Sequence, residues 1–406
     1  MKRNKRLRVA FVGGPMYDYP YSKIPEFERE TGYQVELGAK LIHPQLNEHI
    51  ADLYSKGKGA YDLITTHSKY APSQKEWLSS LDEDIGKEEL AGYIPATIEL
   101  MRINGNLMQL PRNIDVKLVY YRKDLFEDPK EKKGFKKRFG YELEPPKIWP
   151  HLRDIARFFT RPPDLYGFVF PGRYSGLFGH FFELLAMAGG TLLDKNLKPK
   201  FTSQSGEWAL GFLRGLYFVD KSCPKEVPDW HYDEVAQFFR EGKAAMTTDW
   251  PGSFADYKNP TISKVKDRFA VCIYPSGPSG KRRVYAGGFS YAIPRSCQDR
   301  SGALSLMRFL LSDRMQYEEA KRGAIPVKKA VRERIKKEAQ TGSMEEKRLL
   351  MLEQTVNESL LIPPKFAKYP LVEDVLWKFL QDGFTGKSDV KKVLEKAADK
   401  IGRILK

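Results

Sequence analysis

Hydrophobic residues along the chain follow two patterns that alternate. Short runs of β-branched and aromatic residues, bounded by turn residues, are typical of buried strands. Eight such runs predict strands: RVAFVGG (8–14), YQVELGA (33–39), YDLITTH (61–67), KLVYYR (117–122), YGFVFPG (166–172), AAMTTDW (244–250), FAVCIYP (269–275) and GFSYAIP (288–294).

Longer segments lie between these runs, and their apolar residues recur with the period of an amphipathic helix. They predict helices within 22–32, 44–57, 148–160, 175–190, 205–219 and 301–323, followed by a helical C-terminal third. Alternation of strands and helices predicts an α/β protein whose sheets are mostly parallel and covered by helices.

The length of the chain indicates more than one compact unit. A chain of 406 residues is too long for one ordinary hydrophobic core and has the length of two or three compact units. The turn-rich passages 131–147 and 274–283 separate patterned regions without a clean break. We therefore expect units that are joined by more than one crossing of the chain.

The net charge of the chain does not by itself identify the class of its binding partner. The formal net charge is +16, but Lys and Arg gather in 129–138, 327–338 and 389–406, where Glu and Asp are interspersed at helical spacing. This pattern is typical of solvated helix faces. No nucleic-acid-binding motif accompanies these segments, so we expect no nucleic-acid partner.

Motifs of catalysis and metal binding are missing from the sequence. It contains no nucleophile elbow, zinc-protease or EF-hand pattern, and its histidines are not at metal-ligand spacing. YPSGPSGK (274–281) differs from a phosphate loop because Pro275 takes the place of the first glycine and Arg282 that of the Ser or Thr. We expect no metal and no cofactor.

Aromatic and short polar side chains recur together where the predicted strands end. The set is Tyr17, Thr66, His67, Asn113, Asp115, Arg173, Asp249, Trp250, Gly288 and Phe289. A sugar ring packs its C–H face on an aromatic plane, while its hydroxyls need paired donors and acceptors. Core packing is the alternative for a single tyrosine. It is also open for Trp250, although the flanking Asp249, Pro251 and Gly252 place that ring at a turn.

Several segments, in this order, resemble the extracellular solute-binding proteins of carbohydrate ABC importers, the family that includes maltose-binding proteins. They are LPRNIDVKLVYYRKDLFEDP (110–129), FGYELEPPKIWPHLRDIARFFT (139–160), FREGKAAMTTDWPGSF (239–254), YAGGFSYAIPRSCQ (285–298) and AKRGAIPVKKAV (320–331). The chain departs from the family pattern at Ile148, which replaces a helix-capping Thr, and at Phe289, which replaces a Trp. Pro150 supplies a helix-start signal instead.

The resemblance implies a two-lobe periplasmic-binding-protein fold of type II. Lobe 1 would comprise 1–112 and 276–320, and lobe 2 would comprise 113–275 and 321–406. Three hinge crossings are expected near 111–116, 272–278 and 318–326. The lobes would close around a ligand in the cleft between them.

The function expected from the resemblance is capture of a carbohydrate and its delivery to the membrane subunits of an ABC permease. The protein would be a monomer without enzymatic activity, periplasmic or extracellular, either free or lipid-anchored; no export signal is visible in this chain. The sugar could be a mono- or oligosaccharide, neutral or anionic. Trp250 and Phe289 would stack on its ring, and Asn113, Asp115, Arg173 and Asp249 would bind hydroxyls. Thr66, His67, Gly288 and the Tyr17 loop would line the first lobe.

Two alternatives remain open from the sequence. The basic composition also suits a binding protein for a non-sugar anion. Two of the residues Asp115, Glu183 and Asp249 could supply the carboxylate pair of a glycoside hydrolase. Such catalysis requires a defined distance between the two carboxyl groups, which the sequence does not give.

Overall fold

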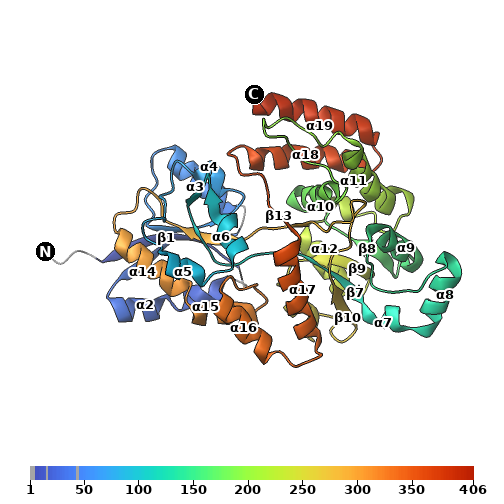
Figure 1. The fold of residues 1–406 in the computed structure, drawn as a ribbon, viewed down its shortest axis with the longest axis horizontal. Coiled ribbons are helices and arrows are strands. Elements are labelled where there is room, and N and C mark those ends of the chain that lie inside the picture. The colour runs from blue at the N-terminus through green and yellow to red at the C-terminus, as the bar shows by residue number, and fades with distance from the viewer. Residues whose placement is uncertain (1–4, 15–16, 43–44) are drawn as a thin grey trace. The chain divides into compact units, whose positions relative to one another are not determined.

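The chain folds into two compact units, as a computed structural model that describes residues 5–14, 17–42 and 45–406 shows (Figure 1). Unit 1 comprises Met1–Asp115, Ala286–Gln340 and Ile362–Tyr369. Unit 2 comprises Val116–Tyr285, Thr341–Leu361 and Pro370–Lys406. Five boundaries result. The first lies within the predicted crossing 111–116, and the others lie at residues outside the three predicted crossings.

Local packing explains where these boundaries fall. The segment after Cys272 stays with unit 2 because β11 (Val284–Tyr285) pairs in parallel with β13 (Leu360–Leu361). The helix that follows 318–326 stays with unit 1, where Lys329 N–H donates to the carbonyl of Gly92 at 2.9 Å. Unit 2 therefore continues past the expected crossing 272–278 to Tyr285, and unit 1 continues past the expected crossing 318–326 to Gln340.

Unit 1 contains a five-stranded sheet in the order β2-β1-β3-β12-β6. Its strands are β1 (Arg6–Val12), β2 (Gln34–Leu41), β3 (Leu63–His67), β6 (Leu110–Pro111) and β12 (Phe289–Ala292). The strand β1 pairs in parallel with β2 and β3, whereas β12 runs antiparallel to β3 and β6. A small hairpin joins β4 (Arg102–Ile103) and β5 (Asn106–Leu107). This sheet brings the ends of β3 and β12 together.

Unit 2 contains a four-stranded sheet in the order β10-β7-β9-β8. Its strands are β7 (Leu118–Arg122), β8 (Tyr166–Val169), β9 (Ala244–Asp249) and β10 (Phe269–Cys272). Both β10 and β9 pair antiparallel with β7, and β8 pairs in parallel with β9. Because β10 is the first strand in this order, it forms one edge of the sheet.

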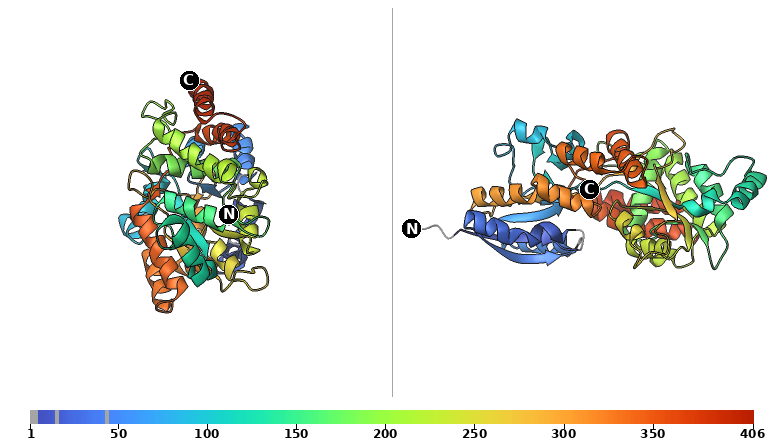
Figure 2. Two further views of the ribbon diagram at one scale, coloured as in Figure 1. Left: turned by 90° about the vertical axis from the view of Figure 1, so that its right-hand side faces the viewer. Right: turned by 90° about the horizontal axis from the view of Figure 1, so that it is seen from below.

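Helices flank both sheets, as two further views show (Figure 2). Those of unit 1 are α1 (Asp18–Ser22), α2 (Ile24–Thr31), α3 (Gln45–Ser55), α4 (Ala71–Gln74), α5 (Lys87–Ala91), α6 (Pro95–Met101), α14 (Arg300–Leu310), α15 (Asp313–Lys321) and α16 (Lys329–Glu338). Those of unit 2 are α7 (Lys123–Glu127), α8 (Pro129–Phe139), α9 (Trp149–Phe159), α10 (Tyr174–Met187), α11 (Gln204–Arg214), α12 (Tyr232–Arg240), α13 (Ser253–Lys258), α17 (Met344–Glu358), α18 (Tyr369–Phe384) and α19 (Val390–Leu405). A π-helical turn (Gly215–Val219) follows α11, and a 3₁₀ turn (Val227–Asp229) precedes α12.

The two-lobe α/β class is confirmed, but the predominance of parallel pairs is wrong. Both sheets are mixed, and in unit 2 two of the three strand pairs are antiparallel. The physical reason is connectivity. The strands β7 and β12 each follow directly on a crossing from the other unit, so no crossover helix of their own unit makes them parallel to their neighbours.

The sequence signals for helix α9 are confirmed. The helix begins at Trp149, Pro150 occupies its first turn, and Ile148 provides no side-chain cap. Trp149 is 1% exposed and lies in the core of unit 2. Pro44, the first residue of the predicted helix 44–57, lies outside the described residues.

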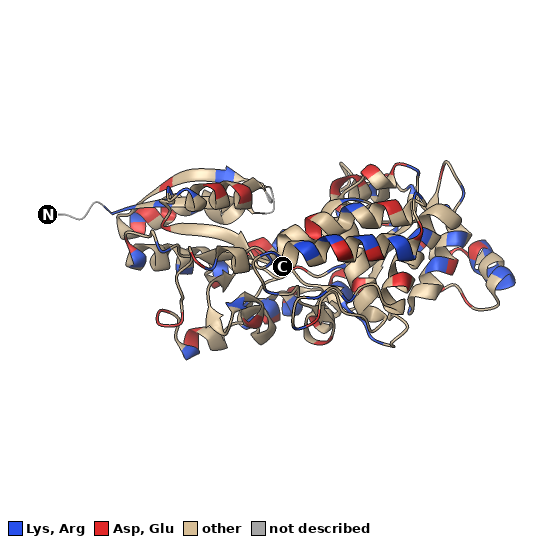
Figure 3. Ribbon diagram, turned by 90° about the horizontal axis from the view of Figure 1, so that it is seen from above, with Lys and Arg blue, Asp and Glu red and all other residues tan. Residues whose placement is uncertain are grey.

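Charged residues are interspersed along the helices, with both signs on the same elements (Figure 3). In α19 the lysines at 391, 392 and 396 are exposed, which agrees with a solvated helix face. Within the described part of the chain, no helix combines the length and apolar character needed to cross a membrane.

Candidate functional site

The tryptophan turn of unit 2 follows the buried strand β9. The carboxylate of Asp249, the last residue of β9, is 2% exposed. Its Oδ1 accepts a hydrogen bond from the Trp250 N–H at 2.7 Å, and its Oδ2 accepts one from the Tyr257 hydroxyl on α13. Burial raises the pKa of Asp249 to about 6. Asp249 therefore holds the shape of the turn, and its expected contact with a ligand hydroxyl stays a prediction.

Trp250 itself is only half-buried, so its ring is not enclosed by the core. Tyr232 packs edge-on against it with 5.4 Å between ring centroids. Lys117 Nζ lies 5.4 Å from the same ring centroid, and this ammonium is fully buried. The indole is thus supported by a tyrosine and a cation, an arrangement that stabilises the electron-rich ring face.

Glu183 on α10 neutralises the buried Lys117. The Lys117 ammonium donates to Glu183 Oε2 at 2.9 Å, and the Tyr274 hydroxyl donates to the same oxygen at 3.2 Å. The other oxygen, Oε1, accepts from the main-chain N–H of Tyr285 at 2.8 Å. Burial raises the pKa of Glu183, while the Lys117 charge opposes this rise. The sequence contained a signal for this pair, because Glu183 is the only Asp, Glu, Lys or Arg residue in the otherwise largely apolar helix α10.

A series of aromatic rings continues from Trp250 along the same unit. His231 packs on Tyr232 with ring centroids 4.6 Å apart, and Tyr174 lies 5.9 Å from His231. Trp377 on α18 lies 4.9 Å from Tyr174, which is 47% exposed and has a φ of 52°. Sequence reasoning missed Tyr232 and Trp377, because each is an ordinary helix residue until the fold places it beside another ring.

Arg173 stands at the start of α10 within this aromatic series. Its guanidinium lies 5.0 Å from the Tyr174 ring centroid, and Nη2 donates to Glu234 Oε1 at 3.1 Å. The Nε–H group is buried, and no hydrogen-bond partner for it lies among the described residues. A buried donor without a partner is costly, which makes this group suited to a ligand acceptor.

In unit 1, Asn113 and Asp115 form a polar pair at the end of the segment that leads to unit 2. Asn113 Nδ2 donates to Asp115 Oδ2 at 2.8 Å, and Asn113 Oδ1 accepts from the Phe289 N–H at 3.0 Å. Asp115 is half-buried, and this burial raises the pKa of its carboxyl to about 7. The structure therefore brings Asn113, Asp115 and Phe289 together.

The remaining candidates of unit 1 are packed against one another. Phe289 is 6% exposed, and its ring contacts Tyr17 and His67 at centroid distances of 5.0 and 5.2 Å. Thr66 is 1% exposed and donates to Gln74 Oε1 at 2.7 Å. Their expected contacts with a ligand stay predictions, because each already has a packing role.

Gly288 has a steric reason to be glycine. A Cβ at this position would lie 2.4 Å from the carbonyl oxygen of Asn113, closer than real side chains come to a backbone oxygen. The close approach of two backbone segments in unit 1 thus explains this residue, and its expected role toward a ligand stays a prediction.

The charged side chains do not assemble into a metal site. Over the residues that the structure describes, no three His, Cys, Asp or Glu side chains come together in a way that could hold a metal ion. Unit 2 offers half-buried aromatic rings and a guanidinium N–H without a partner among the described residues, and unit 1 by itself offers a half-buried carboxyl. Such groups suit a neutral ligand with an apolar face and several hydroxyls.

A family model described as bacterial extracellular solute-binding protein matches residues 17–317. A probable ABC transporter-binding protein of Deinococcus radiodurans is 26% identical over 71% of this chain and 63% of its own length. A mannitol-binding protein of Pseudomonas aeruginosa is 25% identical over 62% of this chain and 56% of its own length. The chain thus spans about three fifths of the length of these curated relatives.

A solved structure, maltose-bound MalE3 of T. maritima, superposes with a TM-score of 0.83. It covers 98% of this chain and 99% of its own, at 23% sequence identity. At this identity the likeness shows the fold, a two-lobe arrangement of mixed sheets and helices.

Proposed function

Because the chain belongs to the bacterial extracellular solute-binding proteins, we propose that it captures a sugar or polyol outside the cytoplasmic membrane for an ABC importer. The observation that carries this proposal is the half-buried Trp250, whose ring packs against Tyr232 and lies 5.4 Å from the Lys117 ammonium. A rigid, partly open indole provides a stacking surface for the C–H face of a sugar.

The polar groups beside the rings support the same ligand class. The Arg173 Nε–H would donate to a hydroxyl oxygen, because it is buried and has no partner among the described residues. In unit 1, considered by itself, the half-buried Asp115 carboxyl would accept from a sugar hydroxyl. The names of two similar proteins support this class, since one is a mannitol-binding protein and the other was solved with maltose.

No catalytic role is proposed for the carboxylates. Asp249 is nearly inaccessible and accepts from Tyr257 and the Trp250 N–H, and Glu183 is fully buried with three partners. These contacts support a structural role for both carboxylates. We expect a bound oligosaccharide to be recovered intact by chromatography after prolonged incubation.

A thermal-shift screen tests the proposal. Mannitol, maltose, tagatose and galacturonate would be compared with phosphate, citrate and free amino acids. A carbohydrate at about one hundred times its Kd should add about 2.7 kcal/mol to the unfolding free energy. Stabilisation by an amino acid or a carboxylate, with none from any carbohydrate, would overturn the proposed ligand class.

A matched pair of tryptophan variants locates the binding site. Trp250→Ala should abolish most of the carbohydrate-induced shift. Trp208→Ala removes another half-buried tryptophan of unit 2, which packs on Phe212 at 5.6 Å, and should leave the shift unchanged. Equal losses in both variants would show that Trp250 has no special role.

A further inference from the structure

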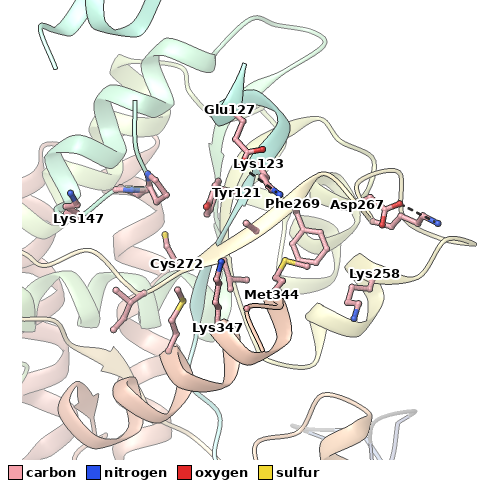
Figure 4. Close-up of a pocket in the computed structure, with 18 of the residues that line it drawn as sticks. Tyr121, Lys123, Glu127, Lys147, Lys258, Asp267, Phe269, Cys272, Met344 and Lys347 are labelled. Carbon is pink, nitrogen blue, oxygen red and sulfur yellow. Dashed lines mark ion pairs between the residues drawn. The ribbon is translucent and has the colours of Figure 1, made fainter. Parts of the chain in front are cut away.

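A groove with a volume of ≈ 740 Å³ lies in unit 2 along the edge strand β10 (Figure 4). Neither Trp250 nor the aromatic residues beside it line this groove. We call it the β10 groove. Its longest continuous stretch of lining is residues 269–273, which include the whole of β10, and further lining comes from 145–147, from β7 and α7, and from α17. The groove therefore follows the unpaired side of a sheet.

Within the described part of the chain, β10 has no second strand partner on this side. The strand pairs with β7, and for residues 269–273 no other main-chain hydrogen bond is found within the described part of the chain. Every second residue of such an edge strand directs its N–H and C=O away from the sheet. These groups form a template on which another extended segment can add as a strand.

The groove reaches around both faces of this edge. Ala270 stands opposite Tyr121 on the neighbouring strand, so these two residues share one face of the sheet, and Phe269 and Val271 belong to the other. All four residues line the groove. Side chains of an added strand, which alternate between the two faces, would therefore find apolar contacts on both.

Basic side chains dominate the rim of the groove. Six Lys and Arg residues line it, against two acidic residues. The two acids are already paired, Glu127 with Lys123 at 3.8 Å and Asp267 with Lys266 at 3.5 Å. Lys147 is also paired, with Glu144 at 2.8 Å, so the excess of positive charge comes from Lys258, Arg282 and Lys347.

Two of the rim lysines are exposed and lack an acidic partner. Lys258 ends α13 and Lys347 lies in the first turns of α17, and neither forms an ion pair with any described carboxylate. Lysines beside an edge strand repel neutral or basic strands of other chains. The same charges attract a strand that carries carboxylates.

We propose that the β10 groove binds an extended peptide segment in which apolar and acidic residues alternate, and that this segment adds to β10 as a further strand. Main-chain hydrogen bonds to β10 would supply the register, and the rim lysines would select acidic side chains. The partner is thus an acidic, unstructured or edge-strand segment of another protein.

Fluorescence anisotropy with short labelled peptides tests the proposal. The probe is an octapeptide of alternating valine and glutamate, and the comparison peptide replaces each glutamate by lysine. We expect the acidic peptide to bind, the basic peptide not to bind, and the affinity to fall with added salt. Absence of binding by the acidic peptide, or equal binding of both, overturns the proposal.

A charge-reversed variant locates the binding. Lys258→Glu together with Lys347→Glu should raise the Kd of the acidic peptide at least tenfold. The matched control is Lys391→Glu with Lys396→Glu, which makes the same change in net charge on the exposed face of α19 and should leave the Kd unchanged. Melting curves of both variants verify that they are folded. Equal effects of the two variants would show that only the net charge matters.

Two further measurements separate strand addition from binding of any anion. An acidic peptide that is N-methylated at every amide has no main-chain N–H left to donate to β10 and should bind at least tenfold more weakly. Hydrogen exchange of the β10 amides should slow when the unmethylated peptide is bound. Strand addition would be overturned if the methylated peptide bound as tightly as the unmethylated one, or if free glutamate competed at the same concentration. It would also be overturned if the Lys258→Glu, Lys347→Glu variant lost binding to phosphatidylglycerol vesicles but kept binding to the peptide.

Discussion

The two units use their prominent aromatic residues differently. Phe289 in unit 1 is 6% exposed and packs against Tyr17 and His67, as part of a core. Trp250 in unit 2 lies at a turn, is half-buried, and lies against Tyr232 and Lys117. An aromatic ring at a strand end can therefore either pack in the core or be available to a ligand. Exposure of the ring separates the two roles.

The same contrast holds for the two buried ion pairs that flank the first boundary between the units. In unit 1 the Arg112 guanidinium pairs with Glu319 and lies against the rings of Tyr17 and Tyr21. In unit 2 the Lys117 ammonium pairs with Glu183 beneath Trp250. Each unit thus neutralises its own buried cation, and only the pair of unit 2 supports the proposed stacking ring.

The largest expected effect comes from breaking the pair beneath Trp250. Lys117→Met leaves the buried Glu183 carboxylate without its cation, so the free energy of unfolding should fall by about 3–5 kcal/mol in urea denaturation. Lys117→Met combined with Glu183→Gln should recover much of this loss, because no buried charge remains. If the double variant were as unstable as the sum of the single variants, the ion pair would not be the cause.

A substitution at each aromatic residue tests the comparison between the units directly. Phe289→Ala should lower the free energy of unfolding by about 3 kcal/mol, because it opens a cavity in the core of unit 1. Trp250→Ala should change stability far less but weaken carbohydrate binding by about 1–3 kcal/mol in calorimetry. A large loss of stability for Trp250→Ala with unchanged affinity would assign both rings to the fold.

A pH series sharpens the role of Asp249. Its folded pKa of about 6 lies above the usual value of an aspartate, so the folded state holds the proton more tightly than the unfolded chain. The stabilisation from this proton is complete below pH 4 and is lost as the pH rises through 6, which corresponds to about 1 kcal/mol between pH 5 and 7. Asp249→Asn should remove this part of the slope in urea denaturation. An unchanged slope would show that other groups cause it.

The smallest expected effect concerns Arg173, whose ion pair with Glu234 is partly exposed. Arg173→Met should change the free energy of unfolding by less than about 1 kcal/mol, because exposed pairs contribute little. Carbohydrate affinity should nevertheless fall, since the variant lacks the buried Nε–H donor. A variant that binds the sugar as tightly as the unchanged protein would remove Arg173 from the proposed site.

Most elements were predictable because their patterns are local. All eight predicted strands are present with shifted ends, since β-branched and aromatic runs bury both faces of a strand. The predicted helix 301–323 is two helices, α14 and α15, that meet at Leu311 and Ser312. The apolar spacing is continuous there, and only packing within unit 1 decides where the first helix ends.

The candidate site was predictable only in part. Trp250 stood out because its neighbours are turn residues, a feature of the sequence alone. The supporting residues Lys117, Tyr232 and Trp377 lie far apart in the sequence, and no local pattern connects them. Asp249 was expected to face a ligand, but the Tyr257 hydroxyl that engages it belongs to the next helix.

The sequence by itself determined which segments form strands and helices, the α/β class, and the presence of a ring at a turn, because each follows from the spacing of neighbouring residues. The tertiary structure alone decided which strands pair, which carboxylates are engaged and which ring stays half-open. These properties depend on contacts between residues far apart in the chain. Gly288 shows the same dependence. A side chain at this position would collide with the main-chain carbonyl of Asn113, which lies 175 positions earlier in the sequence.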